Sequence, residues 1–291
     1  MQPINILVTL DENYMPQLSV MLTSLYINNP GEKFNIYLIH RGISKNRLSG
    51  TEKTMEKFGY GFFPILVDEK YFQDIPTGRL YPQEMYYRLC AQKLLPEDLD
   101  KIIYLDPDLL IINPLRPLWD MDMGGNIFAA AAHTGKTDIS NSVNKLRLGT
   151  ATKYYNSGVL LINLPMARRE VNPEEIFRFA KTHSRELILP DQDILNVLYG
   201  NKILEINDFI WNYDARNYSS YLLRSGGTAD ADWVMRNTAI LHFCGKSKPW
   251  KDVYRHRFGL LYKHYMQIAL RLLTNRGFTI SKTVSKFIFG G

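Results

Sequence analysis

The chain has 291 residues, of which 45% are hydrophobic, and a formal net charge of +6. A chain of this length can bury a large core, as one big domain or as a domain with an appendage. No window approaches the roughly 18 apolar residues of a transmembrane helix, and no charged stretch precedes an apolar one at the amino terminus. We therefore expect a cytoplasmic protein. Cys90 and Cys244 match no zinc or redox spacing, which predicts reduced thiols.

Short β-rich runs alternate with helical patterns along the chain. The periodicity predicts strands at 4–10, 34–40 and 62–67, helices at 17–28, 44–58 and 84–95, a strand that ends at Asp106, and strands at 127–132, 158–163 and 238–243. Such alternation is typical of an α/β fold. We expect a Rossmann-like, mostly parallel sheet flanked by helices, followed by a C-terminal helical extension.

One acidic pair stands out from the five Asp-x-Asp pairs in the chain. Asp106-Pro107-Asp108 follows the apolar run 102–105, whereas the pairs at 98/100, 120/122 and 230/232 lie in polar or turn-rich stretches that suit a solvated surface. Open α/β sheets bind ligands at the carboxyl ends of their strands, and two unpaired carboxylates are costly there. We interpret Asp106 and Asp108 as ligands of a divalent cation, with a capped turn as the alternative.

A second polar segment, residues 242–250, begins at the end of another predicted strand. His242 is a possible metal ligand, Gly245 lets the backbone approach a ligand closely, and Lys248 supplies a positive charge for a diphosphate. With Asp106 and Asp108, His242 would give two oxygen ligands and one nitrogen ligand. That set suits Mn²⁺, with phosphate oxygens in the remaining positions. A purely structural histidine is the alternative.

The two common nucleotide-binding signatures are absent: GxGxxG does not follow the first strand, and GxxxxGK[ST] occurs nowhere. Instead the first strand ends in Asp11-Glu12-Asn13-Tyr14. Tyr14 could stack on a base while Asp11 and Asn13 bind its edge or the ribose. A turn that caps the next helix explains the same residues equally well.

Taken in order, these segments resemble glycosyltransferase family 8, and in particular its bacterial lipopolysaccharide galactosyl- and glucosyltransferases. The resemblance covers about residues 4–252 and rests on six blocks: Asp11–Tyr14, Tyr87–Leu89, Tyr104–Asp108, Tyr155–Asn163, Asp191–Asp193 and His242–Trp250. It implies a GT-A fold, a UDP-sugar donor, Mn²⁺ (with Mg²⁺ as the alternative) and transfer with retention of anomeric configuration. We expect a nucleotide-sugar transferase domain at 1–252 and a basic amphipathic extension at 253–291.

The resemblance also implies a role for each matched residue. The implied metal ligands are Asp106, Asp108 and His242. The implied nucleotide-binding residues are Asp11, Asn13, Tyr14, Asp106, Asp108, Gly245 and Lys248. The implied donor-sugar residues are Arg88, Asn156, Asp191 and Gln192, of which Asp191 and Gln192 are also the catalytic candidates. Without the resemblance, Arg88 would be assigned to a helix surface and Asn156 to a turn.

Retention requires either a covalent intermediate or attack by the acceptor on the face that UDP leaves. The implied position facing the anomeric carbon is Gln192, whose amide is a poor nucleophile. We therefore expect same-face substitution, with Asp191 binding sugar hydroxyls. Mn²⁺ and Lys248 would stabilise the departing diphosphate.

The identity of the sugar and of the acceptor is open. His133 stands where related galactosyltransferases have an aspartate, so UDP-glucose and UDP-galactose are both candidate donors. The acceptor is expected to be a saccharide or a glycolipid, covered by residues 71–86 and 133–155. A metal-dependent nucleotidyltransferase and a non-catalytic UDP-sugar or membrane-surface binding protein are the alternatives, and nucleotide release from a panel of sugar nucleotides distinguishes them.

The carboxy-terminal segment carries the excess positive charge. From Gly245 to Gly291 there are ten Lys and Arg and one acid, Asp252. Apolar residues recur there at helical spacing beside basic ones: Leu261, Tyr265, Ile268, Ala269 and Leu272, with Arg257, Lys263, Arg271 and Arg276. The pattern suits peripheral binding at the anionic inner face of a membrane, and a helix packed on the domain is the alternative. Nucleic acid is not expected, because the aromatics form no stacking platform with the basic residues.

Overall fold

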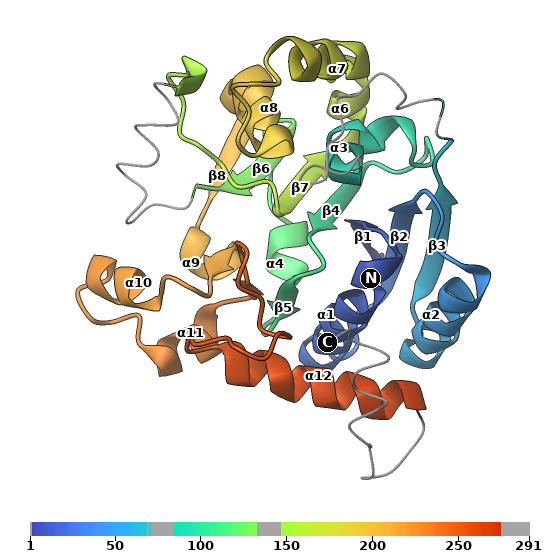
Figure 1. Ribbon diagram of the computed structural model, residues 1–291, viewed down its shortest axis with the longest axis vertical. Coiled ribbons are helices and arrows are strands. Elements are labelled where there is room, and N and C mark those ends of the chain that lie inside the picture. Colours follow the sequence, from blue (N-terminus) through green and yellow to red (C-terminus); the bar gives the residue numbers. More distant parts are fainter. Residues whose placement is uncertain (1, 69, 71–83, 133–146, 275–291) are drawn as a thin grey trace.

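The computed structural model describes residues 2–68, 70, 84–132 and 147–274. Within these residues, seven strands form the main sheet (Figure 1). In spatial order they are β3 (Gly61–Leu66), β2 (Phe34–His40), β1 (Ile4–Thr9), β4 (Lys101–Leu105), β7 (Val159–Asn163), β6 (Phe128–Ala131) and β8 (Ile203–Ile206). Neighbouring strands are parallel except where β7 pairs with β4 and β6. The predicted mostly parallel α/β sheet is confirmed.

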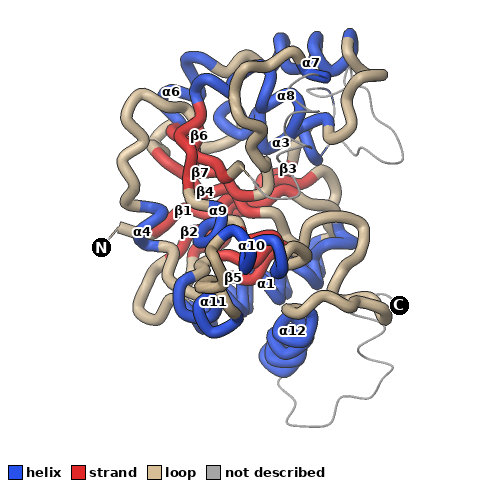
Figure 2. Tube along the Cα trace, turned by 90° about the vertical axis from the view of Figure 1, so that its left-hand side faces the viewer, coloured by secondary structure: helices blue, strands red, loops and turns tan. Residues whose placement is uncertain are grey.

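Helices cover both faces of this sheet, which is why its central strands read as continuous apolar runs. The described helices are α1 (Met15–Asn28), α2 (Lys45–Phe58), α3 (Glu84–Cys90), α4 (Arg116–Trp119), α6 (Leu164–Glu170), α7 (Pro173–Thr182), α8 (Pro190–Tyr199), α9 (Asp208–Trp211), α10 (Tyr218–Arg224), α11 (Ala231–Asn237) and α12 (Gly259–Thr274). In Figure 2, α3, α6, α7 and α8 lie on one side of the sheet and α1 and α12 on the other. One hydrophobic cluster joins the sheet to α1 and α2, and a second joins it to α3, α6, α7 and α8.

A second, three-stranded sheet has the order β5 (Leu109–Ile111), β10 (Ile240–His242) and β9 (Tyr213–Asp214). The strand expected at 238–243 is present as β10, but it belongs to this small sheet and not to the main one. After β4 ends, the turn at 106–108 carries the chain out of the main sheet and into β5. β5 then pairs antiparallel with β10, so that Leu109 lies opposite His242.

The terminal helix α12 packs against α1. Tyr262, Tyr265 and Ala269 are buried in a cluster that includes Val20 of α1, and the amide of Asn28 donates to the Tyr265 hydroxyl at 2.8 Å. Leu272, which also belongs to the predicted apolar stripe, is not buried in this cluster and is 37% exposed. Residues 275–291, including Arg276, lie outside the described residues, as do 71–83 and 133–146 of the segments expected to cover the acceptor. In the described part of the chain, every helix is too short or too polar to cross a membrane.

Candidate functional site

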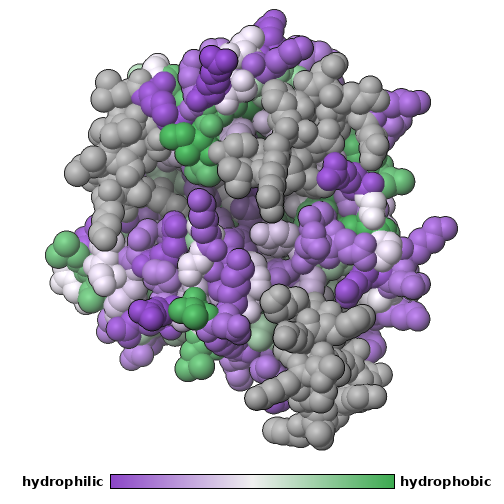
Figure 3. Space-filling view, viewed as in Figure 1, coloured by the Kyte–Doolittle hydropathy of each residue, from purple (hydrophilic) through white to green (hydrophobic). Residues whose placement is uncertain are grey.

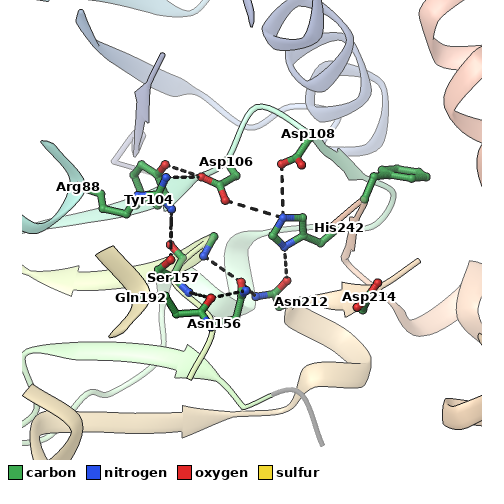
Figure 4. Close-up of polar contacts among 12 residues, drawn as sticks. Arg88, Tyr104, Asp106, Asp108, Asn156, Ser157, Gln192, Asn212, Asp214 and His242 are labelled. Atoms are coloured by element: carbon green, nitrogen blue, oxygen red, sulfur yellow. Dashed lines mark hydrogen bonds and ion pairs between the residues drawn. The ribbon is translucent and has the colours of Figure 1, made fainter. Parts of the chain in front are cut away.

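The carboxyl end of β4 carries the acidic pair, and the small sheet brings His242 to it. The backbone N–H of Asp106 donates to the carbonyl of Gly158 at 2.9 Å, which fixes the turn beside β7. His242 Nε2 lies 3.8 Å from Asp106 Oδ2 and 3.4 Å from Asp108 Oδ1 (Figure 4). One ligand atom from each of the three residues lies within 4.8 Å of the others. The predicted set therefore converges on one point.

A chain of amides sets the orientation of the histidine. His242 Nδ1 lies 2.9 Å from Asn212 Oδ1, while Asn212 Nδ2 donates to Asn156 Oδ1 at 2.8 Å. Because the Asn212 oxygen must accept, Nδ1 carries the proton and Nε2 faces the carboxylates. An imidazole fixed in this way beside two carboxylates has the chemistry of a divalent-cation ligand, so the residues present fit such an ion.

The charged groups around the cluster shift one another's pKa values. Burial opposes ionisation of Asp108, but Lys248 and His242 hold the pKa of its carboxyl well below the usual range. Burial would lower the pKa of His242, yet Cys244 and Asp108 beside it raise that pKa well above its ordinary value. A divalent cation bound here would therefore compete with a proton for Nε2.

Gly158 permits the close approach of the cluster to β7. A Cβ atom at this position would lie 2.4 Å from His242 Cε1 and 2.6 Å from Asp106 Oδ2. Both distances are far below van der Waals contact, so any side chain here would displace a member of the cluster.

Arg88 of α3 is buried, which contradicts the surface assignment that its position on a helix suggests. Its NH2 group lies 3.0 Å from Asp106 Oδ1 and its NH1 group 3.3 Å from Asp191 Oδ2. The guanidinium stacks on Tyr104, 4.5 Å from the ring centroid, and the Tyr104 hydroxyl donates to Asp106 at 2.5 Å. Arg88 thus joins the acidic pair to α8.

The amino end of α8 carries the two catalytic candidates. Ser157 Oγ donates to Asp191 Oδ2 at 2.8 Å, and burial raises the pKa of Asp191 against the opposing charge of Arg88. Gln192 Oε1 accepts from Asn156 Nδ2 at 2.9 Å and from the backbone N–H of Ser157 at 3.3 Å. Both side chains are therefore fixed by hydrogen bonds to residues 156–157, just before β7.

Two adjoining cavities meet at these residues, and both are lined by Met85, Arg88, Asp106 and Asp108. The first, of about 270 Å³, is also lined by Asp11 and Tyr14. The second, of about 560 Å³, is also lined by the other predicted site residues, Asn156, Asp191, Gln192, His242, Gly245 and Lys248. A path thus runs from the end of β1, past the acidic pair, to α8.

Asn13 is the one predicted site residue outside both cavities. Its backbone N–H donates to Asp11 Oδ1 at 2.9 Å and its side-chain amide to Asp11 Oδ2 at 3.1 Å. This is the capping turn that the sequence offered as an alternative. Tyr14 is 37% exposed and packs edge-on against Trp250.

Lys248 reaches the acidic pair. Its Nζ atom contacts Asp108 Oδ2 and donates to the carbonyl of Phe243 at 3.0 Å. Gly245 has a φ of +80°, and a Cβ atom there would meet Arg216 NH1 at 2.2 Å, so both backbone conformation and space require glycine.

Several residues of the site were missed as individual candidates: Tyr104, Ser157, Asn212 and Arg216. Tyr104 and Ser157 lie inside blocks that carry the family resemblance. Asn212 and Arg216 flank β9, a strand of two residues that is too short to leave a periodic signal.

Comparisons with known proteins identify the family of the chain. The model of "Glycosyl transferase family 8" matches residues 5–253. General stress protein A of Bacillus subtilis is 30% identical over 264 residues, covering 88% of this chain and 90% of that protein. A lipopolysaccharide 1,2-glucosyltransferase of Escherichia coli is 25% identical, covering 84% and 72% of the two chains.

Among solved structures, the galactosyltransferase LgtC, determined with donor and acceptor sugar analogs, superposes with a TM-score of 0.78. It is 25% identical, and the match covers 96% of this chain and 98% of that one. The predicted GT-A architecture is thereby confirmed. Because the family model spans most of the sequence, the chain belongs to glycosyltransferase family 8 and is a glycosyltransferase.

Proposed function

We propose that the protein transfers glucose or galactose from a UDP-sugar to a saccharide or lipid-linked acceptor, with Mn²⁺ as cofactor and with retention of anomeric configuration. Membership of the family implies a sugar-nucleotide donor and a saccharide acceptor. The observation that carries the finer proposal is the position of Asp106, Asp108 and His242 where the two cavities adjoin. Similar proteins named as lipopolysaccharide glucosyl- and galactosyltransferases support a hexose.

The first cavity suits the nucleoside. Tyr14 offers an aromatic ring at its edge, and Asp11 offers carboxylate oxygens for hydroxyl or amide donors. A diphosphate would then lie at the shared carboxylates, where a divalent cation held by Asp106, Asp108 and His242 compensates for its charge. Asn13 supports the nucleoside through its bonds to Asp11.

Breaking the bond between sugar and UDP increases negative charge on the diphosphate. The divalent cation supplies charge compensation for this leaving group when it is bound. Lys248 would add a second positive charge beside the diphosphate, since its Nζ atom contacts Asp108. Gly245, which has no side chain, would let the backbone approach the diphosphate oxygens as well.

The bonding of α8 favours same-face substitution. Gln192 is an amide whose oxygen is occupied by Asn156 and Ser157, and Asp191 is buried with bonds to Arg88 and Ser157. Neither group is a free carboxylate beneath an anomeric carbon, which a covalent intermediate needs. We assign both residues to binding and orienting the donor sugar.

The decisive experiment incubates the protein with Mn²⁺ and UDP-, GDP- and CMP-sugars and measures release of free nucleotide. We expect slow hydrolysis of UDP-glucose or UDP-galactose, abolished by EDTA and by Asp108→Ala. Proton NMR of a transferred product should show the donor's anomeric configuration. Wild-type turnover with EDTA present, or in Asp108→Ala, would refute the metal assignment, and pyrophosphate-linked products would indicate a nucleotidyltransferase.

A further inference from the structure

Four described Lys and Arg side chains line the second cavity: Arg88, Arg216, Lys246 and Lys248. They are not equivalent, because Lys246 is exposed whereas the other three are each held by a carboxylate. Arg88 is paired with Asp106 and Asp191, and Lys248 with Asp108, all of which line the same cavity. Arg216 instead pairs with Asp214, which does not line it. Arg216 therefore places a positive charge in the wall of the second cavity, while the carboxylate that pairs with it lies outside the cavity lining.

Its position follows from strand pairing. Asp214 ends β9 opposite His242 at the end of β10, and the two strands are parallel (Figure 4). The backbone N–H of Ala215 continues the ladder to the His242 carbonyl at 2.9 Å. Residues just beyond both strands consequently share one edge, which places Arg216 beside Cys244 and Gly245.

The guanidinium is held rigidly from one side. Asp214, which is 1% exposed, accepts from Arg216 Nε at 2.9 Å and from NH2 at 2.7 Å. Within the described residues, NH1 donates no hydrogen bond, and it lies so close to Gly245 that a Cβ atom there would be 2.2 Å away. A fixed guanidinium with a vacant donor group in a cavity wall is suited to an oxyanion.

We propose that Arg216 is an oxyanion-binding residue of the transfer site and that its NH1 group binds a phosphate or carboxylate oxygen of a substrate beside Gly245. The inference rests on the proposed function. The oxyanion has two possible sources, the diphosphate of the donor and an anionic group on the acceptor, and the chemistry required of Arg216 is the same for both.

The test compares wild type with Arg216→Gln and with Arg224→Gln as the matched control. Arg224 pairs with a buried aspartate, Asp208, at 2.8 Å, but it lines neither cavity. UDP and uridine are titrated by calorimetry in Mn²⁺, and inorganic phosphate is then titrated into the UDP-saturated protein. If Arg216→Gln does not fold, Arg216→Lys replaces it, because it keeps the charge and loses the planar fork.

For a donor oxyanion, we expect Arg216→Gln to weaken UDP binding by at least about tenfold while uridine binds unchanged. For an acceptor oxyanion, UDP affinity stays constant and phosphate binding is lost. Wild-type affinities for both probes in Arg216→Gln, or equal losses in Arg224→Gln, would overturn the inference. If the wild type binds no UDP, the proposed function itself fails, and phosphate titration of the free protein still decides the role of Arg216.

Discussion

Gly158 sets the spacing of the acidic pair and the histidine, so its substitution tests the cluster without removing a ligand. In Gly158→Ala, the new methyl would displace His242 or Asp106. We expect Mn²⁺ affinity and transfer rate to fall roughly 10- to 100-fold, as for changes that misorient metal ligands. Mn²⁺ titration calorimetry and steady-state rates are the measurements.

Gly50→Ala is the matched control for this change. Gly50 lies in α2, and apart from its chain neighbours and the backbone of the helix itself nothing lies within 4 Å of the added methyl. The substitution should raise the free energy of unfolding by about 0.5–1 kcal/mol and leave the rate unchanged. Full activity and Mn²⁺ affinity in Gly158→Ala would show that the cluster does not hold the metal.

Lys248 and Gln192 lie in the same cavity but should affect different steps. Lys248→Ala removes a positive charge beside Asp108, and we expect UDP and UDP-sugar to bind roughly 10- to 100-fold more weakly while uridine affinity is retained. Gln192→Ala should leave UDP affinity nearly intact and lower the transfer rate. Calorimetry with the three ligands measures both effects, and equal losses of UDP affinity in the two variants would contradict this division.

At the scale of elements, α8 depends on one buried carboxylate at its start. Asp193, fully buried, accepts from the backbone N–H groups of Ile188 and Leu189 at 2.7 and 3.1 Å and pairs with Arg147 at 2.8 Å. The Tyr154 hydroxyl also donates to it, at 2.5 Å. Asp193 therefore satisfies N–H groups that a helix start leaves open and fixes the segment that carries Gln192.

Asp193→Asn keeps the shape of the side chain but removes its charge and replaces one acceptor oxygen by a donor. We expect the free energy of unfolding to fall by roughly 2 kcal/mol, and the transfer rate to fall more than UDP affinity because the sugar side of the site loosens. Urea unfolding and kinetics measure these effects. Asp232→Asn, which breaks an exposed pair with Arg236, is the control and should change neither the stability nor the transfer rate. A stable and fully active Asp193→Asn would show that Asp193 does not position α8.

The strands and helices could be predicted because their signals are local. β2 was expected at its observed bounds, and α1, α2 and β4 within a few residues, since buried strands and amphipathic helices carry their own periodicity. Partner choice is not local. The antiparallel direction of β7 and the membership of β10 in the small sheet depend on pairing between distant segments.

The same distinction holds for the site. Asp106, Asp108 and His242 were predictable because the acidic pair follows one apolar strand and the histidine ends another. Burial of Arg88 was not, because its partners come from β4 and α8, far away in the sequence. Asn212 and Arg216 follow from tertiary structure alone, since β9 is defined by its pairing with β10.

At the scale of the whole molecule, the question is which side chains the outer surface presents. The face shown in Figure 3 is mainly hydrophilic, with hydrophobic residues in small separate groups. On α12, which buries one face against α1, Leu260 is 81% exposed and Arg271 is also exposed. Apolar and basic side chains thus remain on the outer face of the packed helix, so packing on the domain and contact with an anionic membrane are compatible.

We therefore predict that the intact protein binds anionic vesicles reversibly. Each basic residue near such a surface contributes roughly 1 kcal/mol, and the attraction decays over a Debye length of about 8 Å at physiological salt. Removing residues 275–291 and changing Arg271 to Gln should reduce co-sedimentation with phosphatidylglycerol vesicles, most clearly at low salt. Hydrolysis of UDP-sugar should stay unchanged, because Arg271 lines neither cavity. Binding that is absent from the intact protein, or that ignores both salt and truncation, would leave α12 as a packed helix with a solvated basic face.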